Sequence, residues 1–225
     1  MAVIEGGVSA ALMGVGAETG SPAHITSRPT SHGALGHYAV AATSGTLAAA
    51  LAAAAQLFTW RWVDATRFCV IYSVDARFQT LTAFTGATLT DFGFDLFKVT
   101  AVSAGAGGNA LTGFSKMRSS MAASLIGATD VRIASTAALT ALTTLDTNAI
   151  EQSLGDTQRV NVAAGTEEQR VNDPTLIYAP DPSKGEYPLV LSQNEGFVIR
   201  NRTVWPIAGT GIIQVRVRWA EVTAY

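Results

Sequence analysis

Two segments near the C-terminus alternate apolar and polar side chains, which is the pattern of a β-strand with one buried face. They are Phe197–Thr203 and Gly211–Val222, and the loop between them contains a proline and a glycine. If Thr203 lies opposite Gly211, the two alternations agree in register, so the sequence predicts a β-hairpin. The core face of this hairpin would comprise Phe197, Ile199, Ile213, Val215, Val217 and Trp219.

The opposite face of the predicted hairpin is rich in arginine. It would comprise Val198, Arg200, Arg202, Gln214, Arg216 and Arg218. Four cations on one face repel each other unless carboxylates neutralise them, so we interpret the four arginines as candidate interface residues that pair with carboxylates of a neighbouring subunit or partner protein. The alternatives are a phosphate-binding face, pairing within the chain with Glu186, Glu195 and Glu221, and plain solvation.

Charged residues make up only 14% of the chain, against about a quarter in typical domains. A surface helix needs a charged face, so this scarcity favours strands. The formal charge of -2 gives no electrostatic reason to bind nucleic acid or an anionic membrane. The most apolar stretch, Leu47–Phe58, is about 12 residues of mostly alanine, whereas a membrane helix needs roughly 20 apolar residues. A chain this poor in charge favours permanent packing against other subunits.

Alternation and β-branched residues predict further strands along the chain. These are Leu57–Val63, Arg67–Phe78, Phe92–Val102, Val131–Ser135, Thr175–Tyr178 and Pro188–Ser192, with a weaker candidate at Arg159–Ala163 in a polar surface loop over 156–173. The strand 57–63 would bury Phe58, Trp60 and Trp62 on one face. The strand 67–78 would place Phe68, Val70, Tyr72, Val74 and Phe78 on one face, with Cys69 and Ile71 making its start apolar on both faces.

Helical spacing predicts two short helices, over Lys116–Ile126 and over Asp146–Leu154. The alanine-rich run Leu47–Leu57 is open between helix and extended chain. Residues 1–44 show no hydrophobic period and are rich in Gly, Ser, Thr and Pro, so we expect an extended N-terminal arm, a loose edge segment or a disordered tail. The predicted fold is mainly β: a single antiparallel β-sandwich or jelly-roll-like domain over 45–225, preceded by the arm over 1–44.

No residue group has the spacing of a catalytic, cofactor or metal site. His24, His32 and His37 match no zinc-ligand pattern, and Cys69 reads as a buried structural thiol. The glycines of Gly105–Gly108 lack the lysine and helix of a phosphate loop. The acidic pairs are interpreted as solvated surface rather than hydrolytic carboxylates. These pairs are Asp91 with Asp95, Glu167 with Glu168, and Asp181 with Glu186.

The C-terminal segments GEYPLVLSQNEGFVIRN (185–201) and GIIQVRVRWAEV (211–222) resemble a family of tailed-bacteriophage virion structural proteins. LAAALAAAAQLFTWRW (47–62), FDLF (94–97) and KMRSSM (116–121) are also similar to segments of that family. The motifs are packing and turn residues: in NEGF, Asn194 and Gly196 would supply a turn and Phe197 would start a core strand. The resemblance implies a non-enzymatic, β-rich, oligomeric virion component.

We therefore expect a capsid decoration (cement) protein on the surface of the phage head, a homotrimer that binds the major capsid protein. A head–tail neck or tail-attached protein is an alternative that the motifs do not separate. A tail-tip glycan- or receptor-binding module is another, in which Trp205 in a loop would stack on sugar rings. A hydrolase using acidic loop residues is the least favoured. No cofactor is expected.

Overall fold

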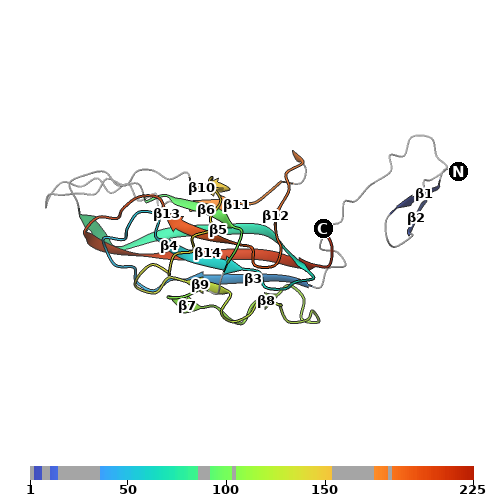
Figure 1. The fold of residues 1–225 in the computed structure, drawn as a ribbon, viewed down its shortest axis with the longest axis horizontal. Coiled ribbons are helices and arrows are strands. Elements are labelled where there is room, and N and C mark those ends of the chain that lie inside the picture. The colour runs from blue at the N-terminus through green and yellow to red at the C-terminus, as the bar shows by residue number, and fades with distance from the viewer. Residues whose placement is uncertain are drawn as a thin grey trace.

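The computed structural model describes residues 3–6, 11–14, 36–85, 92–102, 105–153, 175–181 and 184–225. Its body is built from two six-stranded antiparallel sheets that pack face to face (Figure 1). None of the described residues forms an α-helix. The predicted class, a mainly β protein with two packed antiparallel sheets, is confirmed.

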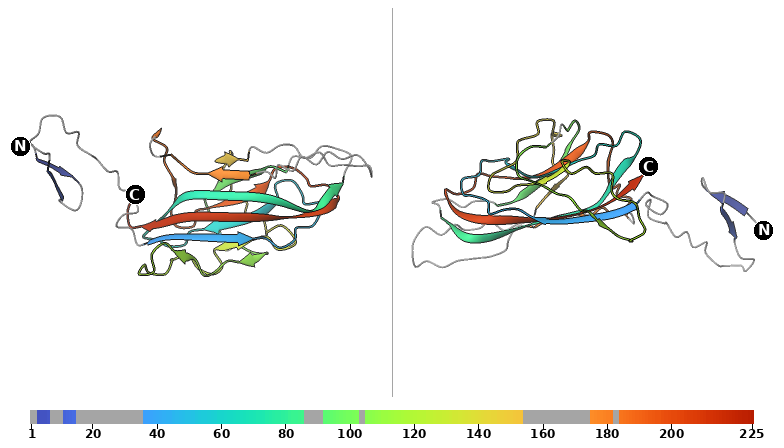
Figure 2. Two further views of the ribbon diagram at one scale, coloured as in Figure 1. Left: turned by 180° about the vertical axis from the view of Figure 1, so that it is seen from behind. Right: turned by 90° about the horizontal axis from the view of Figure 1, so that it is seen from below.

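One sheet, here called the long-strand sheet, is dominated by two strands that run side by side for most of their length (Figure 2). Its strands are β3 (Gly36–Thr43), β5 (Phe68–Thr85), β8 (Ser115–Lys116), β11 (Thr175–Tyr178), β12 (Leu189–Leu191) and β14 (Ala208–Val222). The central strand β14 lies between β5 and β3, while β11 and β12 follow each other along the far edge of β5.

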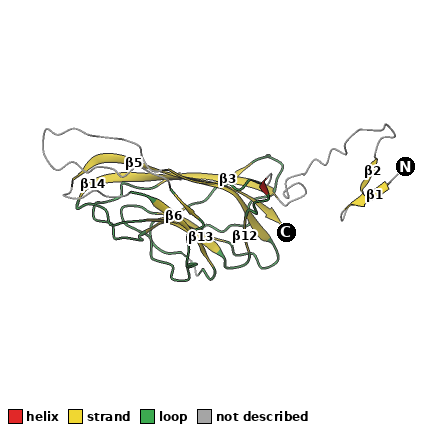
Figure 3. Ribbon diagram, turned by 90° about the horizontal axis from the view of Figure 1, so that it is seen from above, coloured by secondary structure: helices red, strands yellow, loops and turns green. Residues whose placement is uncertain are grey.

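The other sheet, here called the short-strand sheet, has the order β10-β6-β13-β4-β9-β7. Its strands are β4 (Gln56–Arg61), β6 (Phe94–Val99), β7 (Asn109–Ala110), β9 (Val131–Ile133), β10 (Glu151–Gln152) and β13 (Gly196–Asn201). The short-strand sheet and most loops lie on one side of the long-strand sheet (Figure 3).

The core between the sheets is filled by aromatic side chains from both. Trp60 meets Trp219 edge-on, with ring centroids 4.7 Å apart, and stacks on Phe197 at 5.6 Å. All six residues predicted for the core face of the C-terminal segments are buried, as are Phe58, Trp60 and Trp62. Alternation therefore identified the inward faces of these strands correctly.

The predicted C-terminal hairpin is wrong. β13 pairs with β4 and β6, whereas β14 pairs with β5 and β3. The two segments belong to opposite sheets, and their apolar faces meet across the core. A period of two fixes which side chains point inward, but it does not say whether two successive strands lie beside each other or across from each other.

A β-bulge changes the predicted faces of the strand β5. Arg218 lies opposite Ser73 but Trp219 lies opposite Ile71, so Tyr72 is an extra residue on β5. Cys69 and Ile71 therefore point into the core, together with Val74 and Phe78 beyond the bulge. The predicted common face of Phe68, Val70, Tyr72, Val74 and Phe78 is wrong for its first three members. Val70 instead packs with Ala220 and Val222 on the outside, so the start of the strand is apolar on both faces, as expected.

Neither predicted helix forms. Lys116 ends the strand β8, and residues 117–126 form bends, one turn and irregular chain, in which the Met121 sulfur accepts a hydrogen bond from the His37 backbone N–H. Residues 146–153 lead into the short strand β10. The helical spacing does not lead to a helix here, because the backbone groups of both segments form hydrogen bonds with distant strands. One example is the bond from Ser153 N–H to the Phe94 carbonyl.

The alanine-rich run is neither helix nor strand over most of its length. Its backbone bonds to distant segments, as in the bond from Ala50 N–H to the Pro206 carbonyl. Ala50 and Ala54 both have a φ of 58°, a left-handed conformation that no α-helix contains. Leu47 and Leu51 anchor the run in the core.

The boundary predicted at residue 44 is also wrong. Residues 36–43 form the strand β3, which pairs with β14 from Gly36 to Thr43 and belongs to the body. Nearer the N-terminus, β1 (Val3–Gly6) and β2 (Ala11–Gly14) form a separate two-stranded sheet. The rest of the predicted arm, the polar loop over 156–173 and its candidate strand lie outside the described residues.

Candidate interaction face

The side of the long-strand sheet that points away from the core is a broad surface formed by three neighbouring strands. The left view of Figure 2 shows this side directly, with β5, β14 and β3 in front. We call it the outer face. The central part of this face carries Ala39, Ala41, Thr43, Ser73, Asp75, Arg77, Gln214, Arg216 and Arg218. Toward the end of β14 it continues with His37, Val70, Tyr72, Ala220 and Val222.

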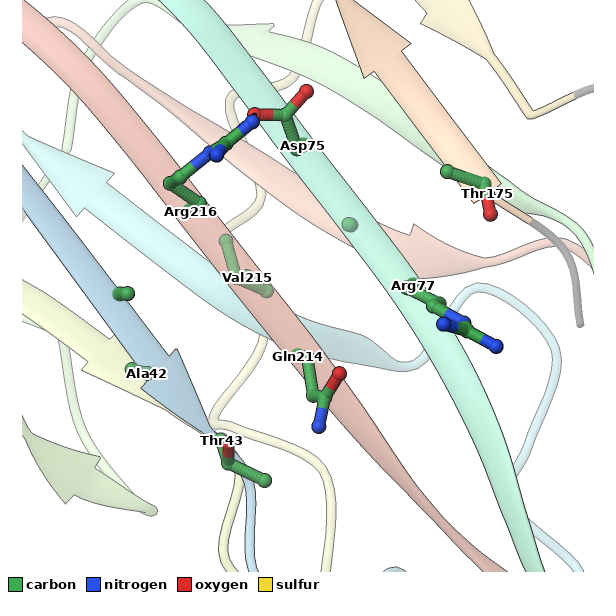
Figure 4. A pocket seen from close by; sticks show the side chains of 10 residues that line it. Ala42, Thr43, Asp75, Arg77, Thr175, Gln214, Val215 and Arg216 are labelled. Atoms are coloured by element: carbon green, nitrogen blue, oxygen red, sulfur yellow. Dashed lines mark hydrogen bonds and ion pairs between the residues drawn. The ribbon is translucent and has the colours of Figure 1, made fainter.

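The strand register arranges these side chains in rows that cross the sheet. Arg216 lies between Asp75 and Ala41, and Gln214 lies between Arg77 and Thr43 (Figure 4). Beside these rows β3 contributes only Ala41 and Thr43 to the surface, so the face is hollowed next to the longer side chains of β14 and β5. The hollow has a volume of about 540 Å³.

Two of the predicted interface arginines lie on this face. Arg216 forms an ion pair with Asp75, with 2.7 Å between Nη2 and Oδ2 and a second bond from Nε at 2.8 Å. Arg218 is exposed and makes no ion pair with any residue that the structure describes. The structure therefore brings together Arg216 and Arg218, two residues apart on β14.

The other two predicted interface arginines lie in the opposite sheet, so the predicted face of four arginines is wrong. Arg202 binds Asp95 at 3.0 Å and the Ser153 carbonyl at 3.2 Å. The Arg200 guanidinium stacks over the Phe97 ring, 3.8 Å from its centroid. Both serve packing inside the fold. The error follows from the hairpin, because strands in different sheets present their outward side chains on opposite sides of the molecule.

The partners of the paired arginines were not those weighed from the sequence. Asp75 and Asp95 hold Arg216 and Arg202, whereas Glu195 pairs with Lys98 at 3.0 Å. Asp75 and Arg216 are far apart in the chain and meet only through strand register. No local sequence signal could identify such a pair without the correct sheet order.

The NEGF turn is structural, as expected. Asn194 takes the left-handed conformation with a φ of 61°, and Glu195 accepts a hydrogen bond from Ser192 N–H at 2.7 Å. A side chain at Gly196 would collide with the Trp60 carbonyl, so glycine lets β13 approach β4 closely. Gly196 is the first residue of β13, and Phe197 supplies its first core side chain.

The residues that could carry chemistry are scattered. His37 stacks on Tyr72 with centroids 5.6 Å apart, and burial raises the pKa of the Cys69 thiol well above its ordinary value. The described residues contain no group of three or more His, Cys, Asp or Glu that could hold a metal ion. In a turn, the Asp181 backbone N–H donates a hydrogen bond to the Glu186 carboxylate at 2.8 Å. The remaining candidates, His24, His32, Asp91, Glu167 and Glu168, lie outside the described ranges.

Trp205, the aromatic residue suggested for glycan stacking, is not exposed. It is 1% accessible and meets Phe78 edge-on at 5.0 Å, with Phe84 and Phe92 beside it. The proposal of a sugar-stacking Trp205 is therefore wrong. Trp205 lies in the connection between β13 and β14, which belong to different sheets. Since this connection crosses from one sheet to the other, the indole packs into the end of the core between them.

Glu221 is a buried carboxylate that sequence reasoning placed only as a surface partner for arginine. It is fully buried and accepts hydrogen bonds from the Ser124 hydroxyl at 2.6 Å, the Leu125 N–H at 3.1 Å and the Trp219 indole N–H at 3.3 Å. It ties the loop at 124–125 to β14. Burial raises its pKa above 4.5, although these hydrogen bonds and the charge of Arg67 act in the opposite direction.

We expect Glu221→Gln to remove one pH-dependent component of stability. A carboxyl whose folded pKa is raised stabilises the fold fully below its unfolded pKa of 4.5, and this contribution is lost as the pH rises through the folded value, at up to about 1.4 kcal/mol per pH unit. The glutamine carbonyl can still accept the bonds made to Oε1. Urea unfolding between pH 4.5 and 8 should show the variant gaining on the wild type as pH rises. Parallel pH profiles would contradict this.

Comparison with protein-family models, with curated proteins and with solved structures finds no match to this chain. Within the described ranges, the chain has no helix long and apolar enough to cross a membrane.

Proposed function

We propose that the chain is a non-enzymatic structural protein of a tailed-phage virion, a capsid decoration protein that binds the major capsid protein and stabilises the head as a homotrimer. The observation that carries this proposal is the outer face. Its central part carries small side chains and arginines, on a sandwich whose core is filled by aromatic side chains. Such a surface is suited to packing against another protein.

Two further observations support a structural role. Polar groups that could have formed a site, such as Asp95 and Glu221, are instead engaged in holding strands and loops together. The segments that resemble phage virion proteins also have packing roles in the fold. The run 47–57 lies against the core through its leucines, and the NEGF turn sets the start of β13.

The test is the copy number of this chain relative to the portal subunit in purified particles, measured by quantitative mass spectrometry. A decoration protein is expected in hundreds of copies per particle. A copy number comparable with that of the portal subunit would instead indicate a neck or tail-attached protein, which is the alternative that the sequence motifs do not separate. Its absence from purified particles would overturn the virion proposal.

A second measurement tests the stabilising role. Particles lacking the chain should lose their DNA at lower temperature or after milder osmotic shock than wild-type particles, because a decoration protein clamps neighbouring capsid subunits. Particles of unchanged stability that nevertheless contain hundreds of copies would contradict stabilisation while leaving the location intact.

A further inference from the structure

We infer that the outer face is the docking surface for an acidic protein partner, and that Arg218 supplies its principal unneutralised charge. The inference rests on the proposed function, since the partner would be another virion protein. It goes further by committing to one surface of the chain and to the charge of what binds there.

The shape of the outer face permits close approach by another protein. A hollow of about 540 Å³ lies on this face, and β3 lines it only with Ala41, Ala42 and Thr43. Gln214 and Arg216 of β14 and Asp75 and Arg77 of β5 also line it (Figure 4). Arg218 follows two residues beyond Arg216 on the same face of β14. A protruding loop or strand end could therefore pack over the alanines while its polar groups reach the guanidinium groups of β14.

The charge of the face is complementary to carboxylates. Asp75 neutralises Arg216, and Arg77 makes contacts of its own. Arg218 is exposed and has no ion-pair partner among the residues that the structure describes. A guanidinium presents five N–H donors in a planar fork that matches a carboxylate in two-point contact.

Two other occupants fit this charge less well. Nucleic acid binding needs many cations to neutralise successive phosphates, whereas the chain has a formal charge of -2 and this face carries three arginines against one aspartate. A second copy presenting the same face would bring like charges together, which is unfavourable at an interface. An acidic surface on a different protein meets neither objection.

The experiment uses the full-length chain and heads purified from a phage in which its gene is deleted. Wild-type protein, Arg218→Glu and Lys184→Glu are each titrated onto these heads, and bound protein is measured after sedimentation at 50 and 300 mM salt. Lys184 is exposed and lies in the turn between β11 and β12, so it is not one of the outer-face residues. Lys184→Glu changes the net charge of the chain by the same amount as Arg218→Glu. Circular dichroism and a melting curve confirm that both variants fold.

Arg218→Glu is expected to weaken binding about tenfold or more and to reduce its salt dependence, whereas Lys184→Glu binds like the wild type. Equal weakening by both variants would mean that net charge alone matters, which would overturn the inference. Undiminished binding of Arg218→Glu would also overturn it while leaving the virion role standing. Failure of the wild-type protein to bind the heads, with the chain also missing from wild-type particles, would instead overturn the proposed function.

Two parallel measurements test the other occupants. Mass photometry of wild type and Arg218→Glu reports whether the reversal dissociates an oligomer, which would show that a second copy occupies the face. A gel-shift titration with duplex DNA reports whether the wild type binds nucleic acid through Arg218. A positive result in either would overturn the acidic-protein partner.

Discussion

Val215→Asp is expected to abolish the native fold of the body. Val215 is 3% exposed and lies on the central strand β14, between Ala42 on β3 and Ala76 on β5. A carboxylate there would face the apolar core, where burying an unpaired charge costs several kcal/mol. That cost is comparable with the whole stability of a typical domain, about 5–15 kcal/mol. Circular dichroism and urea unfolding measure the result.

The matched control is Gln214→Asp, one residue earlier on the same strand. Its side chain points to the outer face beside Arg77 and Thr43, so the same new charge stays in solvent and next to a cation. We expect this variant to unfold within about 0.5 kcal/mol of the wild type. Similar loss of stability in both variants would show that the inward and outward faces of β14 have been assigned incorrectly.

The faces of individual strands were the part of this fold that the sequence predicted best. Alternation in β4, β13 and β14 identified the side chains that point into the core, because successive side chains of a strand point to opposite faces. In β4 and β13 the other face is covered as well, since Thr59 and Val198 are buried. The failure in β5 has an equally physical cause. Tyr72 is the extra residue of a bulge, and a bulge shifts every later side chain to the other face without leaving a break in the local hydrophobic pattern.

The pairing of strands could not be predicted in the same way. β13 and β14 have compatible patterns, but the connection between them crosses from one sheet to the other and places Trp205 in the core. Compatible alternation is necessary for pairing and does not select a partner. The same limitation explains the error in the predicted arginine face. Arg216 and Arg218 were correctly predicted to lie on one strand, but Arg200 and Arg202 were assigned to the same face through a hairpin that does not form.

The short helices failed because their segments bond to distant strands. In the loop at 122–125, the Tyr38 hydroxyl donates to the Ala122 carbonyl at 3.1 Å, and Glu221 accepts from the Leu125 N–H. These bonds replace the contacts that a helix would make within itself. Helical propensity differs by only fractions of a kcal/mol per residue, so a few such long-range bonds outweigh it.

Trp205→Ala is expected to lower the free energy of unfolding by about 3–5 kcal/mol, which is the usual cost of removing a buried aromatic side chain. The indole packs against Phe78, Phe84 and Phe92, so its loss leaves a cavity at the end of the sandwich. For a domain of this size the melting temperature should fall by roughly 6–20 °C. Differential scanning calorimetry and urea unfolding measure both quantities.

Trp205→Phe separates loss of volume from loss of the indole itself. The Trp205 Nε1 atom is buried without a hydrogen-bond partner among the described residues, so phenylalanine keeps a ring in the cluster and removes an unpaired donor. We therefore expect Trp205→Phe to cost clearly less than Trp205→Ala. A Trp205→Ala variant with wild-type stability that had lost affinity for a glycan array would contradict the buried position and restore the surface role. The packing of this tryptophan against three phenylalanine rings makes the stability loss the expected outcome.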